Sequence, residues 1–195
     1  MEPQILESKA ELPTGQKKRL SKIFALSRKR ALLGNVDPIT LCFDEPVLVV
    51  LSEAIKNHSF RQRDCFGYSP RSCVTLRGSV GMHDDPGFGL VVNWFIAQRS
   101  LPFLGNENYF RKEVWAGDDW YFDDRVQLIS NGKSLSLLPG DIFVFDANKP
   151  HAWISNYDCL LIQSTVGKQR KKKTKIICWQ QLVLRARFLP ARAGQ

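Results

Sequence analysis

The sequence has no pair of cysteines at C-x-x-C spacing, and its five cysteines are an odd number. Neither a complete disulfide framework nor a zinc ribbon is therefore predicted, and the thiols are expected to be reduced. The N-terminal segment has acidic residues and the run Lys17-Lys18-Arg19 where a signal peptide would need an apolar core. The apolar runs are also too short to span a bilayer. We expect a protein that is not secreted and has no transmembrane segment, located in the cytoplasm, the nucleus or the nucleoid.

Acidic residues are missing altogether from residues 168–195, which contain nine lysines and arginines. Residues 1–40 contain eight basic and four acidic residues, whereas residues 41–167 contain eleven basic and fifteen acidic ones. We therefore divide the chain into a basic N-terminal arm (1–40), one catalytic domain (41–167) and a basic C-terminal tail (168–195). Basic ends on a mildly acidic domain are typical of a protein with an anionic partner, such as nucleic acid or a phospholipid surface. A solvated tail explains this composition equally well.

Helical periodicity is weak and confined to the N-terminal part of the chain. Apolar residues at helical spacing predict an amphipathic helix over residues 18–32, within the arm. Residues 41–43 and 46–51 are rich in β-branched and aliphatic side chains, which predicts extended chain, and a short helix is predicted over 51–57. The sequence therefore predicts a helical arm that leads into a β-rich domain.

From residue 72 onward, short apolar runs alternate with turn residues. Eight strands are predicted, over residues 73–76, 90–98, 109–115, 125–130, 135–138, 142–146, 152–155 and 159–166. The pair Asn131-Gly132 between two of these runs predicts a tight hairpin. Many short strands without long helices between them favour a mainly β fold, either a sandwich or a jelly roll.

Histidine is scarce, with three in the chain, and two of them lie in sequence patterns that suit a metal site. His83 and Asp85 are two residues apart, so in extended chain their side chains point to the same side. His151 begins a predicted strand after a Pro-Gly-Asp turn, an apolar strand and a polar loop. Two imidazoles and one carboxylate are the ligands that non-haem Fe(II) oxygenases use, because they leave open positions on the metal. Taken singly, His83 suits a turn and His151 a strand end, and His58 is expected at the surface.

Over residues 72–166 this arrangement resembles the Fe(II)- and 2-oxoglutarate-dependent dioxygenase superfamily, and more distantly the cupins. The resemblance implies a double-stranded β-helix, or jelly roll, with His83, Asp85 and His151 as the iron ligands. It also implies that Fe(II), 2-oxoglutarate and O₂ take part in the reaction. Oxidative decarboxylation of 2-oxoglutarate to succinate and CO₂ would drive the oxidation of a C–H bond of the substrate.

The resemblance also implies a cation, usually arginine, that pairs with the distal carboxylate of 2-oxoglutarate shortly after the second histidine. Residues 156–165 contain no lysine or arginine. Arg99, which ends the strand after the His-x-Asp motif, Arg77 before the motif and Lys168 after the last strand are the candidate cations. Gln163 is a candidate hydrogen-bonding partner of the cosubstrate.

Aromatic residues are abundant in the central domain, and Trp94, Trp120 and Tyr121 are candidates for contact with substrate, for example by stacking on a flipped base. A hydrophobic core or hairpin explains the same residues. The predicted activity is hydroxylation or demethylation of an organic substrate, with a nucleobase in nucleic acid as one candidate. The alternatives are a cupin-like metal enzyme that does not use 2-oxoglutarate, and a non-catalytic β-domain that binds nucleic acid.

Overall fold

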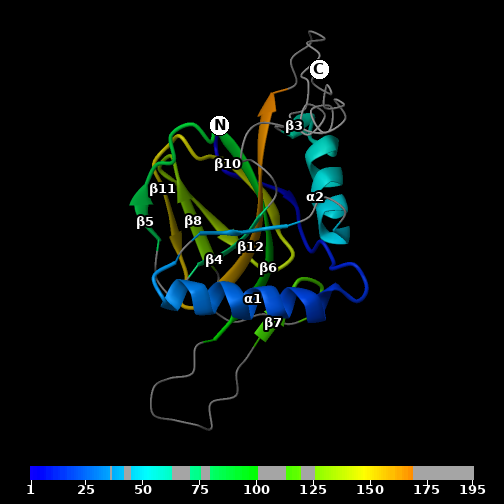
Figure 1. The fold of residues 1–195 in the computed structure, drawn as a ribbon. Helices are drawn as coiled ribbons and strands as arrows, with labels where there is room; N and C mark the ends of the chain where they lie inside the picture. The colour runs from blue at the N-terminus through cyan, green and yellow to red at the C-terminus, as the bar shows by residue number, and fades with distance from the viewer. Residues whose placement is uncertain are drawn as a thin grey trace, which may run out of the picture.

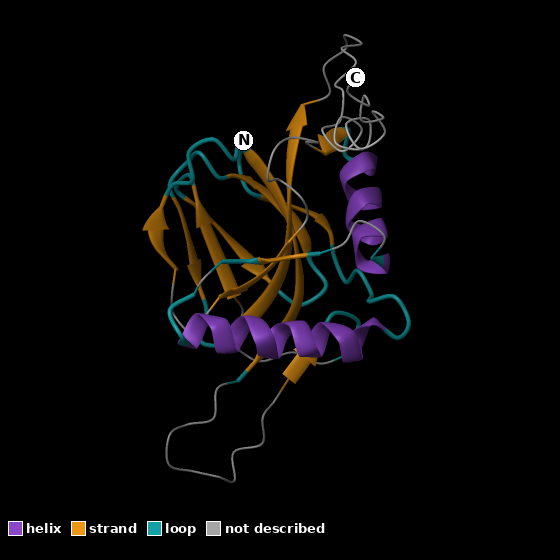
Figure 2. Cartoon of the chain, viewed as in Figure 1, coloured by secondary structure: helices purple, strands orange, loops and turns teal. Residues whose placement is uncertain are grey.

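The computed structural model describes residues 1–35, 37–41, 45–62, 71–75, 80–100, 113–119 and 126–168, with the backbone alone for residues 62, 71–75 and 168. Over these residues the chain is mainly β, with two helices outside the sheets (Figures 1 and 2). The elements are, in order, β1 (Gln4–Glu7), α1 (Gln16–Leu32), β2 (Ile39–Thr40), α2 (Pro46–Asn57), β3 (Phe60–Gln62), β4 (Arg71–Thr75), β5 (Val80–His83), β6 (Leu90–Arg99), β7 (Glu113–Trp115), β8 (Val126–Ser130), β9 (Lys133–Leu137), β10 (Ile142–Asp146), β11 (His151–Ile154) and β12 (Asp158–Lys168).

The strands form two curled antiparallel sheets that face each other (Figure 2). The larger sheet has the order β1-β10-β6-β12-β4-β2, with β3 added to β12 and β7 added to β6. The smaller sheet has the order β5-β11-β8-β9. The arrangement is consistent with a β-sandwich, as the pattern of short strands predicts.

Eight of these strands pair in a nested way along the chain. If β7 is left aside, the strands from β4 to β12 pair first with last: β4 with β12, β5 with β11, β6 with β10, and β8 with β9. Successive pairs alternate between the larger and the smaller sheet. The pairs β12–β6 and β11–β8 join them within each sheet. This pattern is that of one long antiparallel ribbon rolled up on itself.

The innermost pair of this ribbon is the hairpin that Asn131-Gly132 predicts. Ser130 lies opposite Lys133, and the two residues between them have positive φ angles of 52° and 76°. Asparagine and glycine are the residues that tolerate this backbone conformation, and such turns match the twist of the flanking strands. The predicted hairpin is confirmed.

Two groups of buried side chains lie on opposite faces of the larger sheet. One group, including Val91, Phe95 and Phe143, packs between the two sheets. The other, including Trp94 and Phe24, packs between the larger sheet and the helices. Each fully buried aliphatic or aromatic side chain stabilises the fold by about 1.5–3 kcal/mol. The helices are therefore part of the core and not only a covering of it.

The segment from Pro46 to Leu51 is helical, so the prediction of extended chain there is wrong. Pro46 begins α2 as its first residue, a position where its missing N–H costs nothing. The buried residues of α2 are Val47, Leu48, Leu51, Ala54 and Ile55, which have helical spacing. Burial against the sheet outweighs the preference of β-branched residues for strands, because tertiary packing often overrides propensity.

The N-terminal segment also packs into the fold. Strand β1 pairs with β10 at one edge of the larger sheet, and α1 runs across the end of the sheets (Figure 1). Side chains of α1 form three ion pairs with acidic residues elsewhere in the chain: Lys17 with Asp118, Arg19 with Glu45, and Arg28 with Asp158. These pairs and the burial of Leu20 and Phe24 fix the rotation of α1 about its axis.

Asp158 is the most deeply buried of these acidic partners, with none of its side chain exposed. Its oxygen lies 2.9 Å from Arg28 Nε, although the N–H does not point along the contact, so this is an ion pair without an aligned hydrogen bond. Burial raises the pKa of Asp158 above the ordinary value of 3.8, and the nearby charges of Arg28 and Arg99 oppose that shift.

We expect Asp158→Asn to change how stability depends on pH. A carboxyl with a raised pKa in the folded state binds its proton more tightly when folded. Its favourable contribution is therefore complete below pH 3.8 and is lost as the pH rises through the folded-state pKa. The unfolding free energy of the wild type minus that of Asp158→Asn should fall as the pH rises from below 3.8 toward neutrality. Urea titrations at a series of pH values measure this difference, and a difference that rises with pH would contradict the prediction.

Candidate metal centre

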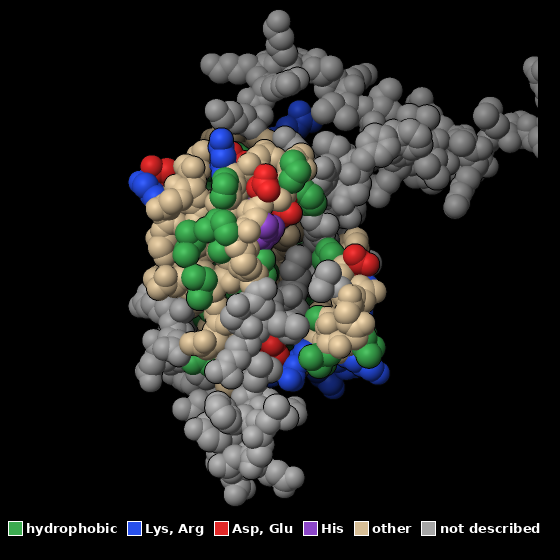
Figure 3. Space-filling view, turned by 90° about the vertical axis from the view of Figure 1, so that its left-hand side faces the viewer, with side chains coloured by type: hydrophobic (Ala, Val, Ile, Leu, Met, Phe, Trp, Pro, Cys, Tyr) green, Lys and Arg blue, Asp and Glu red, His purple; other side chains and the backbone are tan. Residues whose placement is uncertain are grey.

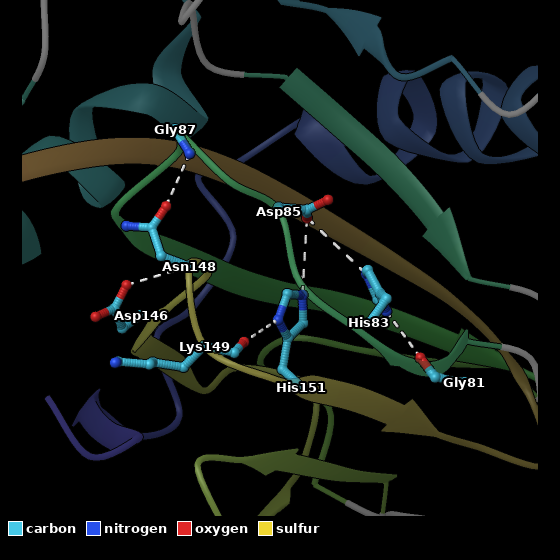
Figure 4. Close-up of polar contacts among 8 residues, drawn as sticks. All are labelled: Gly81, His83, Asp85, Gly87, Asp146, Asn148, Lys149 and His151. Carbon is cyan, nitrogen blue, oxygen red and sulfur yellow. Dashed lines mark hydrogen bonds and ion pairs between the residues drawn. The ribbon is translucent and has the colours of Figure 1, made fainter.

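Three predicted ligands meet at one end of the β5–β11 strand pair. His83 is the last residue of β5 and His151 the first residue of β11, and the two lie directly opposite each other in the smaller sheet. Their ring centroids are 4.3 Å apart. Asp85 follows in the turn after β5, with its carboxylate directed toward both rings (Figure 4). The predicted grouping of these residues is therefore present in the structure.

The ligand atoms are close enough to share one cation. Asp85 Oδ2 lies 3.9 Å from His83 Nε2 and 3.7 Å from His151 Nε2, and the three ligand atoms all lie within 4.8 Å of one another. Metal–ligand bonds of about 2.1 Å place adjacent ligand atoms about 3 Å apart. Small rotations of the side chains bring these atoms to that spacing. Among the described residues, no other group of His, Cys, Asp and Glu is arranged to hold a metal.

Each imidazole is oriented by a backbone carbonyl. His83 Nδ1 lies 2.7 Å from Gly81 O, and His151 Nδ1 lies 2.9 Å from Lys149 O. A carbonyl oxygen only accepts hydrogen bonds, so each Nδ1 must donate its proton to it. In the neutral imidazole the lone pair is then on Nε2, the atom that faces Asp85. Such a hydrogen bond to the second ring nitrogen is typical of metal-bound histidines.

Asp85 is positioned by two loops that hydrogen-bond to each other (Figure 4). Its backbone N–H donates to Ala147 O at 2.7 Å, and the Ala147 N–H donates to Gly89 O at 2.8 Å. The Gly87 N–H donates to Asn148 Oδ1 at 2.8 Å, and Gly87 has a φ of 93°, which favours glycine. The loop after β5 is therefore fastened to the loop before β11.

The site is buried on one side and open to solvent on the other. The side chain of His151 is 7% exposed and packs on the ring of Phe145, with centroids 4.8 Å apart. The side chains of His83 and Asp85 are 38% and 45% exposed. In Figure 3 histidine appears at the surface beside acidic side chains. A ligand can therefore approach the ligand atoms from solvent.

Behind the triad, the inner face of the larger sheet holds polar side chains. Thr165, Val91 and Phe145 form one row across β12, β6 and β10, and Phe145 touches His151. Thr165 is 3% exposed, and its hydroxyl has no hydrogen-bond partner among the described residues. The next row contains Gln163 and Asn93, which is 4% exposed. A buried hydroxyl without a partner is costly, so a polar ligand there would be stabilised.

Arg99, the first candidate for the cosubstrate cation, lies far from the triad. Its Nε lies 2.5 Å from a Glu113 oxygen, and its guanidinium lies over the ring of Phe24, 4.6 Å from the centroid. Arg99 ends β6, whereas Gly89, just before the start of β6, bonds to the loop that holds Asp85. Ten residues of strand separate the two ends, about 30 Å. The structure does not bring Arg99 to the metal centre.

The remaining predicted residues are placed as follows. Trp94 is fully buried among the side chains that pack against the helices, on the other face of the sheet from Phe95. Lys168 ends β12, and only its backbone is described. Arg77, Trp120 and Tyr121 lie outside the described residues. Their roles toward cosubstrate and substrate stay predictions.

Sequence reasoning missed the groups that support the triad. The carbonyls of Gly81 and Lys149 act through the backbone, and a carbonyl gives no signal in a sequence. Asn148 supports the triad through its side chain, which accepts the hydrogen bond from Gly87. Its place in the loop just before His151 is the one signal in the sequence that points to it. His58, expected at the surface, is exposed, with its Nε2 3.1 Å from Leu6 O.

Comparisons of the chain with known protein families, curated proteins and solved structures gave no match. The chemistry of the site is therefore the guide to what this chain does. Within the part of the chain that the structure describes, no helix is long and apolar enough to cross a membrane.

Proposed function

We propose that this protein is an Fe(II)- and 2-oxoglutarate-dependent oxygenase whose iron ligands are His83, Asp85 and His151. The observation that supports it most strongly is the convergence of two Nε2 atoms on one carboxylate oxygen, with each Nδ1 held by a backbone carbonyl. Two neutral imidazoles and one carboxylate suit a divalent iron with open coordination positions. When bound, iron would supply the activation of O₂ that oxidation of a C–H bond requires.

The strand pairing supports a double-stranded β-helix as the fold that holds this site. A jelly roll is a rolled antiparallel ribbon of eight strands, and the nested pairs β4–β12, β5–β11, β6–β10 and β8–β9 have that order. His83 and His151 belong to the second pair of the ribbon. This topology brings β5 and β11 together, and with them two of the three proposed iron ligands.

The residues of the chain have separate tasks in this proposal. His83 and His151 present their lone pairs, and Asp85 supplies the negative charge that offsets the charge of the metal. Phe145 keeps water from one side of His151. The open side at His83 and Asp85 receives the substrate, an organic molecule with an oxidisable C–H or N-methyl group, for which a nucleobase remains one candidate.

The inner face of the larger sheet offers a place for 2-oxoglutarate. The Thr165 hydroxyl would donate a hydrogen bond to a carboxylate of the cosubstrate. The Lys149 side chain extends away from the triad (Figure 4) and so does not suit the role of the cation.

An anaerobic titration tests the function. We expect Fe(II) and 2-oxoglutarate together to give a weak visible charge-transfer band with the folded protein. Thr165→Val should raise the 2-oxoglutarate concentration needed for half of the band by at least about tenfold, because one hydrogen bond to a charged group contributes about 1.5–3 kcal/mol.

Two other outcomes would reject the oxygenase. Metal binding without a band, and without succinate release in air, would indicate a cupin-like metal enzyme. Folded protein that binds no metal would indicate a non-catalytic domain. Circular dichroism of each sample establishes that the protein is folded.

A further inference from the structure

Helix α1 is strongly basic. Its segment Gln16–Leu32 has seven lysines and arginines and no acidic residue. Lys17, Arg19 and Arg28 form ion pairs with acidic residues of the domain, and Arg30 donates to Asn35 Oδ1 at 3.3 Å. These contacts use the cations on the flanks of the helix.

Three lysines of α1 point away from the domain. Lys18, Lys22 and Lys29 are exposed and have no acidic partner among the described residues. They are four and seven residues apart, so they form one row along the helix. Because Leu20 and Phe24 are buried on the opposite side, the helix cannot turn this row toward the domain.

Exposed leucines flank the row of lysines. The exposed fractions of Leu26, Leu32 and Leu33 are 51%, 68% and 76%. We call these leucines together with Lys18, Lys22 and Lys29 the outer face of α1. In Figure 3 basic and apolar side chains gather together at the lower right of the described surface. A face that combines only cations with apolar side chains suits a partner that is both anionic and able to take up apolar groups.

We propose that the outer face of α1 docks on the surface of an anionic phospholipid bilayer. Lysines near such a surface are attracted by its negative potential, and leucines enter the boundary between headgroups and acyl chains. Nucleic acid would attract the lysines but would give the exposed leucines no apolar environment. The combination therefore favours lipid over nucleic acid.

The docked orientation leaves the metal centre accessible. Arg99, at the end of β6, touches Phe24 of α1, whereas Gly89 at its other end bonds to the loop that holds Asp85. The strand between them is about 30 Å long, so the open side of the triad lies well away from a bilayer under α1. Substrate could then reach the site from the aqueous phase.

Vesicle co-sedimentation of the full chain tests the proposal. Wild-type protein is expected to bind vesicles of phosphatidylcholine and phosphatidylserine in equal parts, and to bind vesicles of phosphatidylcholine alone far more weakly. The triple variant Lys18→Glu, Lys22→Glu, Lys29→Glu should lower the partition coefficient by at least about 100-fold, since each lysine near the surface contributes about fivefold and the three factors multiply. The matched control Lys9→Glu, Lys56→Glu, Lys133→Glu has the same net charge and should lower it much less.

A second variant separates lipid from nucleic acid. Leu26→Gln, Leu32→Gln, Leu33→Gln keeps the charge and the core, and should lower the vesicle partition coefficient by about tenfold through the loss of apolar contact. Its affinity for a DNA duplex should not change. Equal vesicle binding by the leucine variant and the wild type would overturn the proposal, as would equal loss in the two lysine triples. Wild-type protein that binds duplex but not vesicles would overturn it in favour of nucleic acid.

Discussion

Replacing His151 by alanine is expected to weaken Fe(II) binding by more than about 100-fold. Substitution of groups that only orient a metal ligand typically costs 10–100-fold in affinity, so the loss of the ligand itself should cost more. His151 is the most buried of the three ligands, and its Nε2 lies 3.7 Å from Asp85 Oδ2. With His151 gone, His83 and Asp85 form an incomplete and partly exposed site. Anaerobic equilibrium dialysis with Fe(II) measures the change.

The control for this variant is His58→Ala. His58 is exposed at the C-terminal end of α2, touches Leu6 O and is not one of the three grouped ligands, so its removal should leave the Fe(II) affinity unchanged. Asp85→Ala should behave like His151→Ala, because it removes the one negative charge among the three ligands. Equal Fe(II) affinity in His151→Ala and the wild type would show that the metal binds elsewhere, and the proposed site would be wrong.

The sequence patterns that predicted most accurately were local ones. His83 ends β5, Asp85 follows two residues later, and His151 begins β11 after a turn, so the local pattern of strand and turn places all three close to strand ends. The Asn131-Gly132 hairpin depends only on the backbone preferences of two residues. Local rules were sufficient wherever the structure is set by neighbours in sequence.

Features that depend on distant contacts were not predicted. Residues 46–51 are helical because their apolar side chains pack against the larger sheet. Residues 4–7 form strand β1 because they pair with β10 at the edge of that sheet. The sequence predicts Arg99 as a candidate cation because it ends the strand after the motif, yet that end lies beside α1. The period of a strand fixes which face a side chain takes, but not which end of the strand lies near a site.

Replacing Arg28 by alanine is expected to destabilise the fold by about 3–5 kcal/mol, because removal of one partner leaves the fully buried Asp158 without its nearest counter-charge. That is a large part of the total stability of about 5–15 kcal/mol that a folded protein has. Urea denaturation at neutral pH measures the loss.

The matched control breaks another ion pair between α1 and the domain. The side chains of Lys17 and Asp118 are 57% and 29% exposed, so Lys17→Ala should cost less than about 1 kcal/mol. The double variant Arg28→Ala, Asp158→Asn should recover most of the stability that Arg28→Ala loses, because the buried charge is then absent as well. If the double variant were no more stable than Arg28→Ala, the loss would come from the packing of the arginine side chain and not from the stranded charge of Asp158.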